Sequence, residues 1–420
     1  MTTKFLRLSV TSALALVAVL TLMPPAAVSQ PQVADGYVIE QNCPNIDVAG
    51  LGVPASWNAG QMALSKNGKQ LFLTYLTTGL GQVHVRDLER CTQEVLIANI
   101  DTPLGIAVHP HTGHLYITHR YLNPEYVVGD PLYKKYRSAV SIYDSHTGHL
   151  LVDKWVKGFA PSIPSRVPGE GEAGNGLQGL TFDRAGNLYM ACNLDVWETV
   201  SDPPDFYATG PLYKVNPHGE VSVFATGLRA SFEAVIAKRD RHGEATAFYA
   251  GDNGEGNFCA AAGNGCAERV VLGSNPSRAI TRQYYDELNY VVKGGHYGYP
   301  ESAPTVPFDV AQNVTHIGPL WNFDRVLGAG FVPGTPGWPV PTGLALLEGH
   351  WGKVKDPLFL TFWLGRRLDM FTGPNQSQRT TLVSDLPGRG MDVVVRPQDN
   401  EVFFAEDATR TIWTIRPDPQ

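Results

Sequence analysis

The sequence predicts an all-β chain folded as a six-bladed β-propeller with four-stranded antiparallel blades. Three observations lead to this prediction: a β-hairpin pattern occurs six times, a further apolar strand follows each hairpin, and none of these segments has the 3.6-residue period of a helix. Each blade of a propeller buries its faces against its two neighbours. The 420 residues therefore fit one closed ring rather than several separate cores.

The hairpins consist of two short apolar or alternating strands joined by a polar turn. Gly, Asn, Asp or Pro fills each turn, as a half-buried hairpin requires. The clearest copy covers residues 105–119, with Gly113 in its turn. The other copies cover residues 61–75, 179–192, 234–251, 343–362 and 392–406.

A third strand follows every hairpin, and a fourth is visible in most units. The third strands are expected at 82–87, 139–144, 211–216, 287–292, 367–372 and 411–416. Fourth strands are expected at 94–98, 150–154, 221–225 and 380–384. The sixth unit has no fourth strand before residue 420, and the spare strand 37–41 near the N-terminus can supply it. We therefore expect a propeller domain over 36–417, with its ring closed by the N-terminal strand.

The first 29 residues have the pattern of a secretory signal peptide. Lys4 and Arg7 precede an apolar run over 8–23, and small residues at 27–29 provide a cleavage site near Ser29. A membrane anchor is the alternative, which the shortness of the run and the two prolines after it disfavour. We expect a secreted or periplasmic protein with no membrane span after signal cleavage.

The formal net charge of −7, without any Lys/Arg cluster, argues against a nucleic-acid partner. Export makes the five cysteines candidates for disulfides. Cys259 and Cys266 flank a small loop and are expected to pair. Cys43 and Cys91 form a second candidate pair, since the entry segment would lie beside blade one. Cys192 is then left as a buried thiol.

A candidate calcium site lies in the segment 251–257, Gly-Asp-Asn-Gly-Glu-Gly-Asn. Its carboxylates, amides and main-chain carbonyls form the oxygen-rich shell that Ca²⁺ prefers. The ligands would include Asp252, Gly254 and Glu255. The same residue types are also ordinary turn formers, and the segment alone does not decide between the two interpretations.

The run 286–301, Asp-Glu-Leu-Asn-Tyr-Val-Val-Lys-Gly-Gly-His-Tyr-Gly-Tyr-Pro-Glu, resembles a known family. It is similar to the soluble quinoprotein glucose and aldose-sugar dehydrogenases and their sorbosone-dehydrogenase and Hedgehog-interacting relatives. Those proteins have an Asp-Glu-x-Asn strand followed by Gly-x-Asn/His-Tyr-Gly-aromatic-Pro. Further matches are Thr-Gly-Leu-Arg at 226–229, Gly-Arg-Gly-Met-Asp-Val at 388–393 and Glu-Asp at 406–407.

The resemblance implies a pyrroloquinoline quinone (PQQ) cofactor at the axial face, polarised by Ca²⁺. It also implies a small-molecule substrate, a sugar or another alcohol, whose hydride passes to the quinone, and an external electron acceptor. Positions that match the family's cofactor or metal residues are Arg229, Asn253, Gly254, Asp286, Arg389 and Asp407. His296, inside the motif, is expected to line the same face.

The chain departs from the family pattern at several positions. Where the family has its catalytic histidine, this sequence has Asn175 or, if the alignment is shifted, Gln178, and neither amide can accept a proton at useful pH. A carboxylate would have to serve as the base instead, and the candidates are Asp101, Glu170 and Glu172. Leu364 stands where the family has a lysine, so that Arg366 would reach in, and Met391 replaces a further basic residue.

Three functions remain open on the sequence. The first is a secreted PQQ-dependent sugar or alcohol oxidoreductase with a divergent base. The second is a Ca²⁺-dependent propeller hydrolase or lactonase. The third is a non-catalytic binding propeller with a vestigial cofactor pocket.

Overall fold

The structure is a computed structural model. It describes residues 30–77, 79–124, 136–159, 176–192, 211–228, 231–252, 268–271, 279–282, 286–297, 320–323 and 340–419. The expected signal peptide lies outside these residues. Over the described ranges the chain is all β, apart from the 3-10 turn η6 (Pro374–Gln376). None of the helical structure in these ranges is long and apolar enough to cross a membrane.

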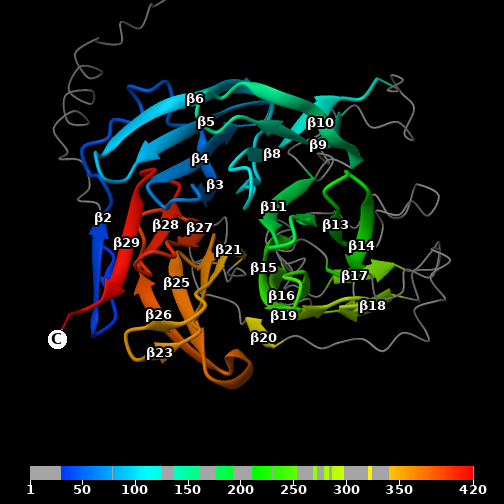
Figure 1. Ribbon diagram of the computed structural model, residues 1–420. Helices are drawn as coiled ribbons and strands as arrows, with labels where there is room; N and C mark the ends of the chain where they lie inside the picture. The colour runs from blue at the N-terminus through cyan, green and yellow to red at the C-terminus, as the bar shows by residue number, and fades with distance from the viewer. Residues whose placement is uncertain are drawn as a thin grey trace, which may run out of the picture.

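Six small antiparallel sheets form a six-bladed β-propeller (Figure 1). Blade one contains β3 (Asn58–Leu64), β4 (Gln70–Thr77), β5 (Leu80–Asp87) and β6 (Thr92–Ile100). Blade two contains β7 (Ile106–Val108), β8 (Leu115–Leu122), β9 (Tyr136–Tyr143) and β10 (Leu150–Phe159). Blade three contains β11 (Leu177–Phe182), β12 (Leu188–Cys192), β13 (Leu212–Val215) and β14 (Val221–Ala225).

The remaining blades carry the additions to the basic pattern. Blade four contains β15 (Ser231–Arg239), β16 (Ala245–Asp252), β19 (Asp286–Val292) and β20 (Trp321–Phe323). Blade five contains β21 (Pro341–Leu346), β24 (Leu358–Phe362), β25 (Arg367–Thr372) and β26 (Gln378–Ser384), extended by β1 (Gln32–Val33). Blade six contains β27 (Gly390–Val395), β28 (Val402–Glu406), β29 (Ile412–Pro417) and β2 (Tyr37–Gln41).

The ring closes as the sequence predicts. The innermost strands contact one another in the order β3, β7, β11, β15, β21 and β27, and β27 in turn contacts β3. Strand β2 completes blade six by pairing antiparallel with β29, with Tyr37 opposite Pro417 and Gln41 opposite Trp413. In Figure 1 the blue N-terminal strand lies directly beside the red C-terminal one. First and last segments of the domain therefore share one sheet.

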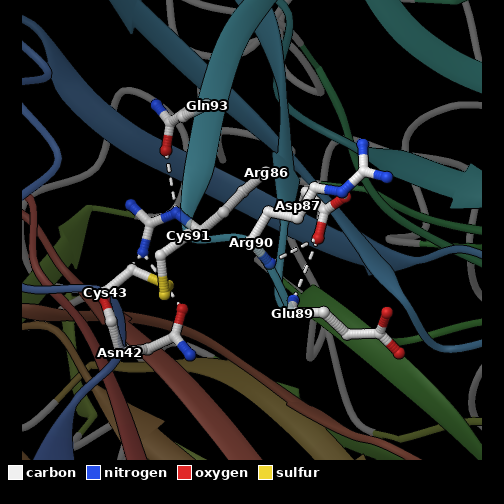
Figure 2. Close-up of a disulfide and its surroundings, with 8 residues drawn as sticks. All are labelled: Asn42, Cys43, Arg86, Asp87, Glu89, Arg90, Cys91 and Gln93. Atoms are coloured by element: carbon white, nitrogen blue, oxygen red, sulfur yellow. Dashed lines mark hydrogen bonds and ion pairs between the residues drawn. A yellow bond between two sulfur atoms is a disulfide. The ribbon is translucent and has the colours of Figure 1, made fainter.

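A disulfide fixes the same junction to blade one (Figure 2). Cys43 follows β2, and its partner Cys91 lies in the turn between β5 and β6, which confirms that pairing. Beside it, the buried Arg86 donates hydrogen bonds to the main-chain oxygen of Asn42 (3.1 Å) and to the side chain of Gln93 (2.8 Å). The N-terminal segment is thus paired with blade six and covalently tied to blade one.

The core lies between the blades. Successive side chains of an innermost strand point to opposite faces, so Met62 and Leu64 pack between blades six and one while Ala63 packs between blades one and two. Cys192 is a buried free thiol within the cluster between blades two and three, as expected. The Cys259–Cys266 pairing lies outside the described residues. Because side chains turn sideways into these clusters, the free backbone edges of the innermost strands face the axis.

Some elements are not predicted by the sequence. Strand β20, the outermost strand of blade four, has only three residues, and β1 has only two, so neither shows a usable alternation. Two small hairpins were also unforeseen: β17 (Glu268–Val271) with β18 (Ala279–Arg282), and β22 (His350–Trp351) with β23 (Val354–Lys355).

Candidate functional site

The two ends of the ring carry different residues. We call the end at which the innermost strands begin the entry face, and the opposite end the exit face. Because the blades are antiparallel, second strands finish on the entry face. Residues proposed from the sequence that lie at strand ends on this face are Asp101, Gln178, Asp252, Arg366, Arg389 and Asp407.

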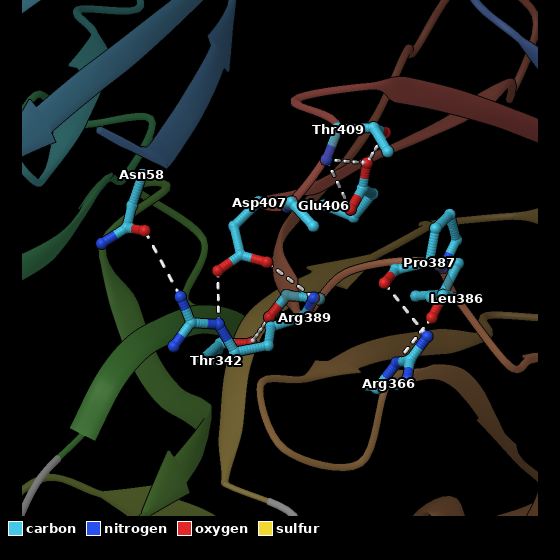
Figure 3. A network of polar contacts seen from close by, with 11 residues as sticks. Asn58, Thr342, Arg366, Leu386, Pro387, Arg389, Glu406, Asp407 and Thr409 are labelled. Atoms are coloured by element: carbon cyan, nitrogen blue, oxygen red, sulfur yellow. Dashed lines mark hydrogen bonds and ion pairs between the residues drawn. The ribbon is translucent and has the colours of Figure 1, made fainter. Parts of the chain in front are cut away.

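Arg389 and Asp407 form the best-defined polar cluster of the entry face (Figure 3). Arg389 precedes β27, and Asp407 follows β28. The Asp407 carboxylate accepts hydrogen bonds from the Arg389 main-chain N–H (2.7 Å) and from its Nε. Asn58, at the start of blade one, accepts a further bond from the guanidinium at 3.3 Å. The Arg389 Cζ lies 4.5 Å from the ring centroid of Trp363, on blade five.

This cluster has the properties of a preorganised anion site. The Asp407 side chain is only 3% exposed, whereas that of Arg389 is 34% exposed. A buried carboxylate and an aromatic face therefore hold a guanidinium whose remaining surface is open to a ligand. The three blades that meet here are five, six and one.

Arg366 makes two side-chain hydrogen bonds to the main chain. Its Nε donates to the main-chain oxygen of Leu386 (2.6 Å), and its terminal nitrogen donates to that of Pro387 (3.0 Å). These two bonds connect the turn between β24 and β25 of blade five to the loop that enters blade six (Figure 3). Met391, where a basic residue was expected, packs against the hydrophobic core between blades six and one.

Asp101 is a carboxylate candidate that lies on the entry face between blades one and two. Its Oδ1 accepts hydrogen bonds from the Nε of Arg120 (3.0 Å) and from the hydroxyl of Thr102 (2.8 Å). The Arg120 side chain is only 4% exposed, so the structure holds this carboxylate in one place. Asp101 is therefore a fixed anionic group rather than a mobile one.

Gln178 lies at the start of the innermost strand of blade three. It is 2% exposed, and its buried Oε1 has no hydrogen-bond donor in the structure. Its main-chain oxygen approaches Gly105 of blade two so closely that a Cβ at that position would lie 1.7 Å from it. Only glycine can occupy position 105 with this packing. The buried amide oxygen of Gln178 therefore lacks the hydrogen-bond donor that buried polar atoms usually have.

The other sequence candidates are only partly placed. Asp252 is buried and ends β16 on the entry face. Asp286 begins β19, the next strand of the same blade. His296 is not brought to the axis: it pairs with Thr226, beside the outermost strand of blade three. The candidates that lie outside the described residues are Asn175, Arg229, Asn253, Gly254, Glu255, Glu170 and Glu172.

Sequence reasoning missed a pair of carboxyl groups at the axis. Glu233 of blade four and Asp392 of blade six meet there. The Asp392 Oδ2 accepts from the N–H of Met62 at 2.5 Å, and the Glu233 Oε2 accepts from that of Leu344 at 2.6 Å. A Cβ on Gly343 would lie 2.3 Å from the Asp392 Cα, so a glycine is needed there. Four blades therefore contact this pair.

Burial is the main cause of the pKa shifts of these two carboxyl groups. It raises the pKa of Asp392 from 3.8 to about 7, although N–H donors act in the opposite direction. Burial and the neighbouring Asp392 carboxylate raise the pKa of Glu233 well above its ordinary value. The one available signal in the sequence was that β15 and β27 each contain a single acidic residue among mainly apolar neighbours.

Histidines do not form a metal site in the described part of the chain. The ring nitrogen Nδ1 of His109 accepts main-chain N–H groups of its own turn, and His119 contacts the hydroxyl of Ser141 at 2.8 Å. Across those ranges there is no group of three or more His, Cys, Asp or Glu side chains that could hold a metal ion.

Fold and site together define a six-bladed propeller whose entry face carries a fixed arginine. Comparison with solved structures gives the same architecture. A glucose dehydrogenase is similar with a TM-score of 0.57 and 14% identity, over 91% of this chain and 100% of the other. The PQQ domain of pyranose dehydrogenase from Coprinopsis cinerea has a TM-score of 0.57 and 14% identity, over 93% and 98%. The calcium structure of a Trichoderma reesei carbohydrate-active enzyme has a TM-score of 0.50 and 14% identity, over 92% and 97%.

These likenesses establish the fold of the chain. No family model matches the sequence, and no curated protein matches it.

Proposed function

We propose that this protein is a quinoprotein-type oxidoreductase that oxidises a sugar or another alcohol, with PQQ bound at the entry face and Ca²⁺ beside it. The observation that supports the proposal most directly is the Arg389 cluster. The sequence motifs at 226–229, 286–301 and 388–393, and the likeness to a PQQ domain, suggest which quinone to test.

The described residues fit PQQ in part. PQQ carries carboxylate groups, and a guanidinium held by Asp407 and Asn58 is suited to bind one of them. The Trp363 ring beneath Arg389 limits the movement of the guanidinium. Of the proposed metal ligands, the described residues include Asp252, while Gly254 and Glu255 lie outside them.

When bound, PQQ would accept the hydride of the substrate carbon, with Ca²⁺ polarising the quinone. The chain's own residues would bind the cofactor and orient it. Arg389 would hold a cofactor carboxylate, and Asp407 would keep the guanidinium in place from its buried position. Because Asp407 is already bonded to the Arg389 main chain, this orientation precedes ligand binding and costs little entropy on association.

The proton of the substrate hydroxyl needs an acceptor. An amide cannot serve, which excludes Gln178 as a general base. Among the described residues we propose Asp101, whose carboxylate is fixed by Arg120 and Thr102. Replacing a general base lowers kcat by about 10²- to 10⁴-fold, so Asp101→Asn is expected to lose turnover while retaining PQQ.

The test is a titration of the purified protein with PQQ in the presence of CaCl₂. Quenching of tryptophan emission reports binding, and dye reduction across a panel of aldoses and alcohols reports turnover. We expect saturable quenching, and Arg389→Met should raise the Kd about ten-fold or more, since one charge-assisted contact is lost.

Arg396→Met is the matched control. Arg396 follows the other end of β27, on the exit face, where it pairs with Asp399 and Glu401 at 2.6 Å. It should leave the Kd for PQQ unchanged. An absence of quenching and of dye reduction with PQQ and Ca²⁺ would overturn the proposal. Chelator-sensitive lactone hydrolysis without PQQ would replace it with the hydrolase alternative.

A further inference from the structure

A polar groove of about 950 Å³ lies on the exit face, away from the Arg389 cluster. It is formed where three segments meet: the end of β15, the loop between β21 and β24, and the loop between β25 and β26. Arg184, from the hairpin turn of blade three, closes one side. Volumes of this size are at the upper end of ordinary ligand sites, which span about 300–1,000 Å³.

The groove is rich in positive charge, although the whole protein is acidic. Five cationic side chains and three carboxylates line it. Of those carboxylates, Glu348 is shared by Arg184 (3.3 Å) and Arg239, and Asp356 lies 4.0 Å from Lys355. The third, Asp240, accepts main-chain N–H groups of its own turn.

Two exposed lysines of the groove remain available to a ligand. Lys238 is the penultimate residue of β15, and Lys353 lies in the small hairpin of β22 and β23. Neither makes an ion pair with another residue in the part of the chain that the structure describes. Lys238 belongs to blade four and Lys353 to blade five, so the two lysines line the groove from opposite sides.

A buried amide provides an independent sign of a ligand. Gln376 is 6% exposed and lines the groove, with its Nε2 donating to the main-chain oxygen of Asp356 at 3.2 Å. Its Oε1 is buried and has no donor in the structure. An unsatisfied buried acceptor is costly, and a hydroxyl of a bound molecule would satisfy it.

The lining matches one chemical class. Amides and hydroxyls (Thr372, Asn375, Gln376, Gln378) suit the hydroxyl groups of a sugar, and the lysines suit an acidic substituent on it. We propose that this groove is a second binding site that takes an anionic oligosaccharide, bearing carboxylate or sulfate groups.

This inference is independent of the quinone proposal, because the groove lies on the opposite face and needs no cofactor. The experiment is calorimetric titration of the full chain, without PQQ, at 20 mM and 300 mM NaCl. The probes are tetragalacturonate, a sulfated tetrasaccharide and neutral galactotetraose. We expect an anionic probe to bind at low salt and to weaken at high salt, since exposed charges are screened.

The double variant Lys238→Gln/Lys353→Gln should raise the Kd of the anionic probe about ten-fold, which corresponds to about 1.4 kcal/mol. Both lysines are exposed, so the fold should tolerate the change. The control Lys66→Gln/Lys157→Gln removes two exposed lysines from blades one and two and should have no effect. Gln376→Met should weaken binding of the same probe.

Binding by either anionic probe that depends on Lys238 and Lys353 supports the proposal, and the two probes distinguish carboxylate from sulfate. Equal binding of neutral galactotetraose would overturn it, as would no binding of any probe. An affinity that the double variant leaves unchanged would place the ligand elsewhere and would also overturn it.

Discussion

Replacing Glu233 by glutamine should change how the stability of the protein depends on pH. The substitution keeps the size of the side chain and an oxygen to accept the N–H of Leu344. Its new amide can still donate to Asp392. What it removes is one titrating proton at the axis of the ring.

The sign follows from the raised pKa values. Burial raises the pKa of both carboxyl groups, so the folded protein retains protons that the unfolded chain has already lost. The stability that these groups contribute is complete below their unfolded pKa values and falls as pH rises, for Asp392 until about pH 7. Each retained proton lowers the free energy of unfolding by about 1.4 kcal/mol per pH unit.

Glu233→Gln removes a group that retains its proton in the folded protein after the unfolded chain has lost it. Relative to the wild type, the free energy of unfolding of the variant should therefore rise as the pH increases from 5 to 7, by at most about 1.4 kcal/mol per pH unit. Urea unfolding followed by tryptophan fluorescence at pH 5, 6 and 7 measures this difference directly. Glu94→Gln, at an exposed position of β6, is the control and should keep the wild-type profile. Parallel profiles of wild type and Glu233→Gln, within about 0.5 kcal/mol, would refute the reasoning.

Three other changes test the ring and its entry face. Replacing Cys43 and Cys91 by serine opens a link across 48 residues and should lower the free energy of unfolding by about 2–4 kcal/mol; an unchanged urea midpoint would show that the disulfide does not stabilise the ring. Gly105→Ala places a Cβ 1.7 Å from a carbonyl oxygen of blade three and should cost about 3 kcal/mol or more, or abolish folding, so a variant with the wild-type midpoint would contradict the close approach. Asp407→Asn deprives the partly exposed Arg389 of its anionic partner, which should lower the free energy of unfolding by about 1–3 kcal/mol and weaken PQQ binding. A wild-type urea midpoint together with a wild-type Kd for PQQ would argue against the cluster.

Much of the fold could be predicted because its signals are local. A hairpin needs two alternating strands and a turn, and both are visible within about fifteen residues, as in the copy around Gly113. The N-terminal strand was predicted to close the ring because blade six lacked a fourth strand. Strand β20 could not be found in this way, since three residues show no alternation and the strand is identified only by its pairing with β19.

The site was less predictable because its contacts join distant blades. Glu233 and Asp392 are 159 residues apart in the printed sequence, and only the closed ring places them together. Arg366 is expected to face the cofactor, and its hydrogen bonds to the carbonyls of Leu386 and Pro387 could not be predicted, since they join two loops 20 residues apart. Arg389 and Asp407 were proposed from a motif and do lie together, although their contacts with Asn58 and Trp363 were not foreseen.

The shared sheet of β2 and β29 has a consequence for biosynthesis. A ribosome makes β2 about 370 residues before β29, so the edge of the early strand stays uncovered until the last segment emerges. Blades one to five can assemble during this delay, but blade six cannot be completed. Formation of the Cys43–Cys91 bond in the meantime would keep the waiting strand close to the place where its partner finally arrives.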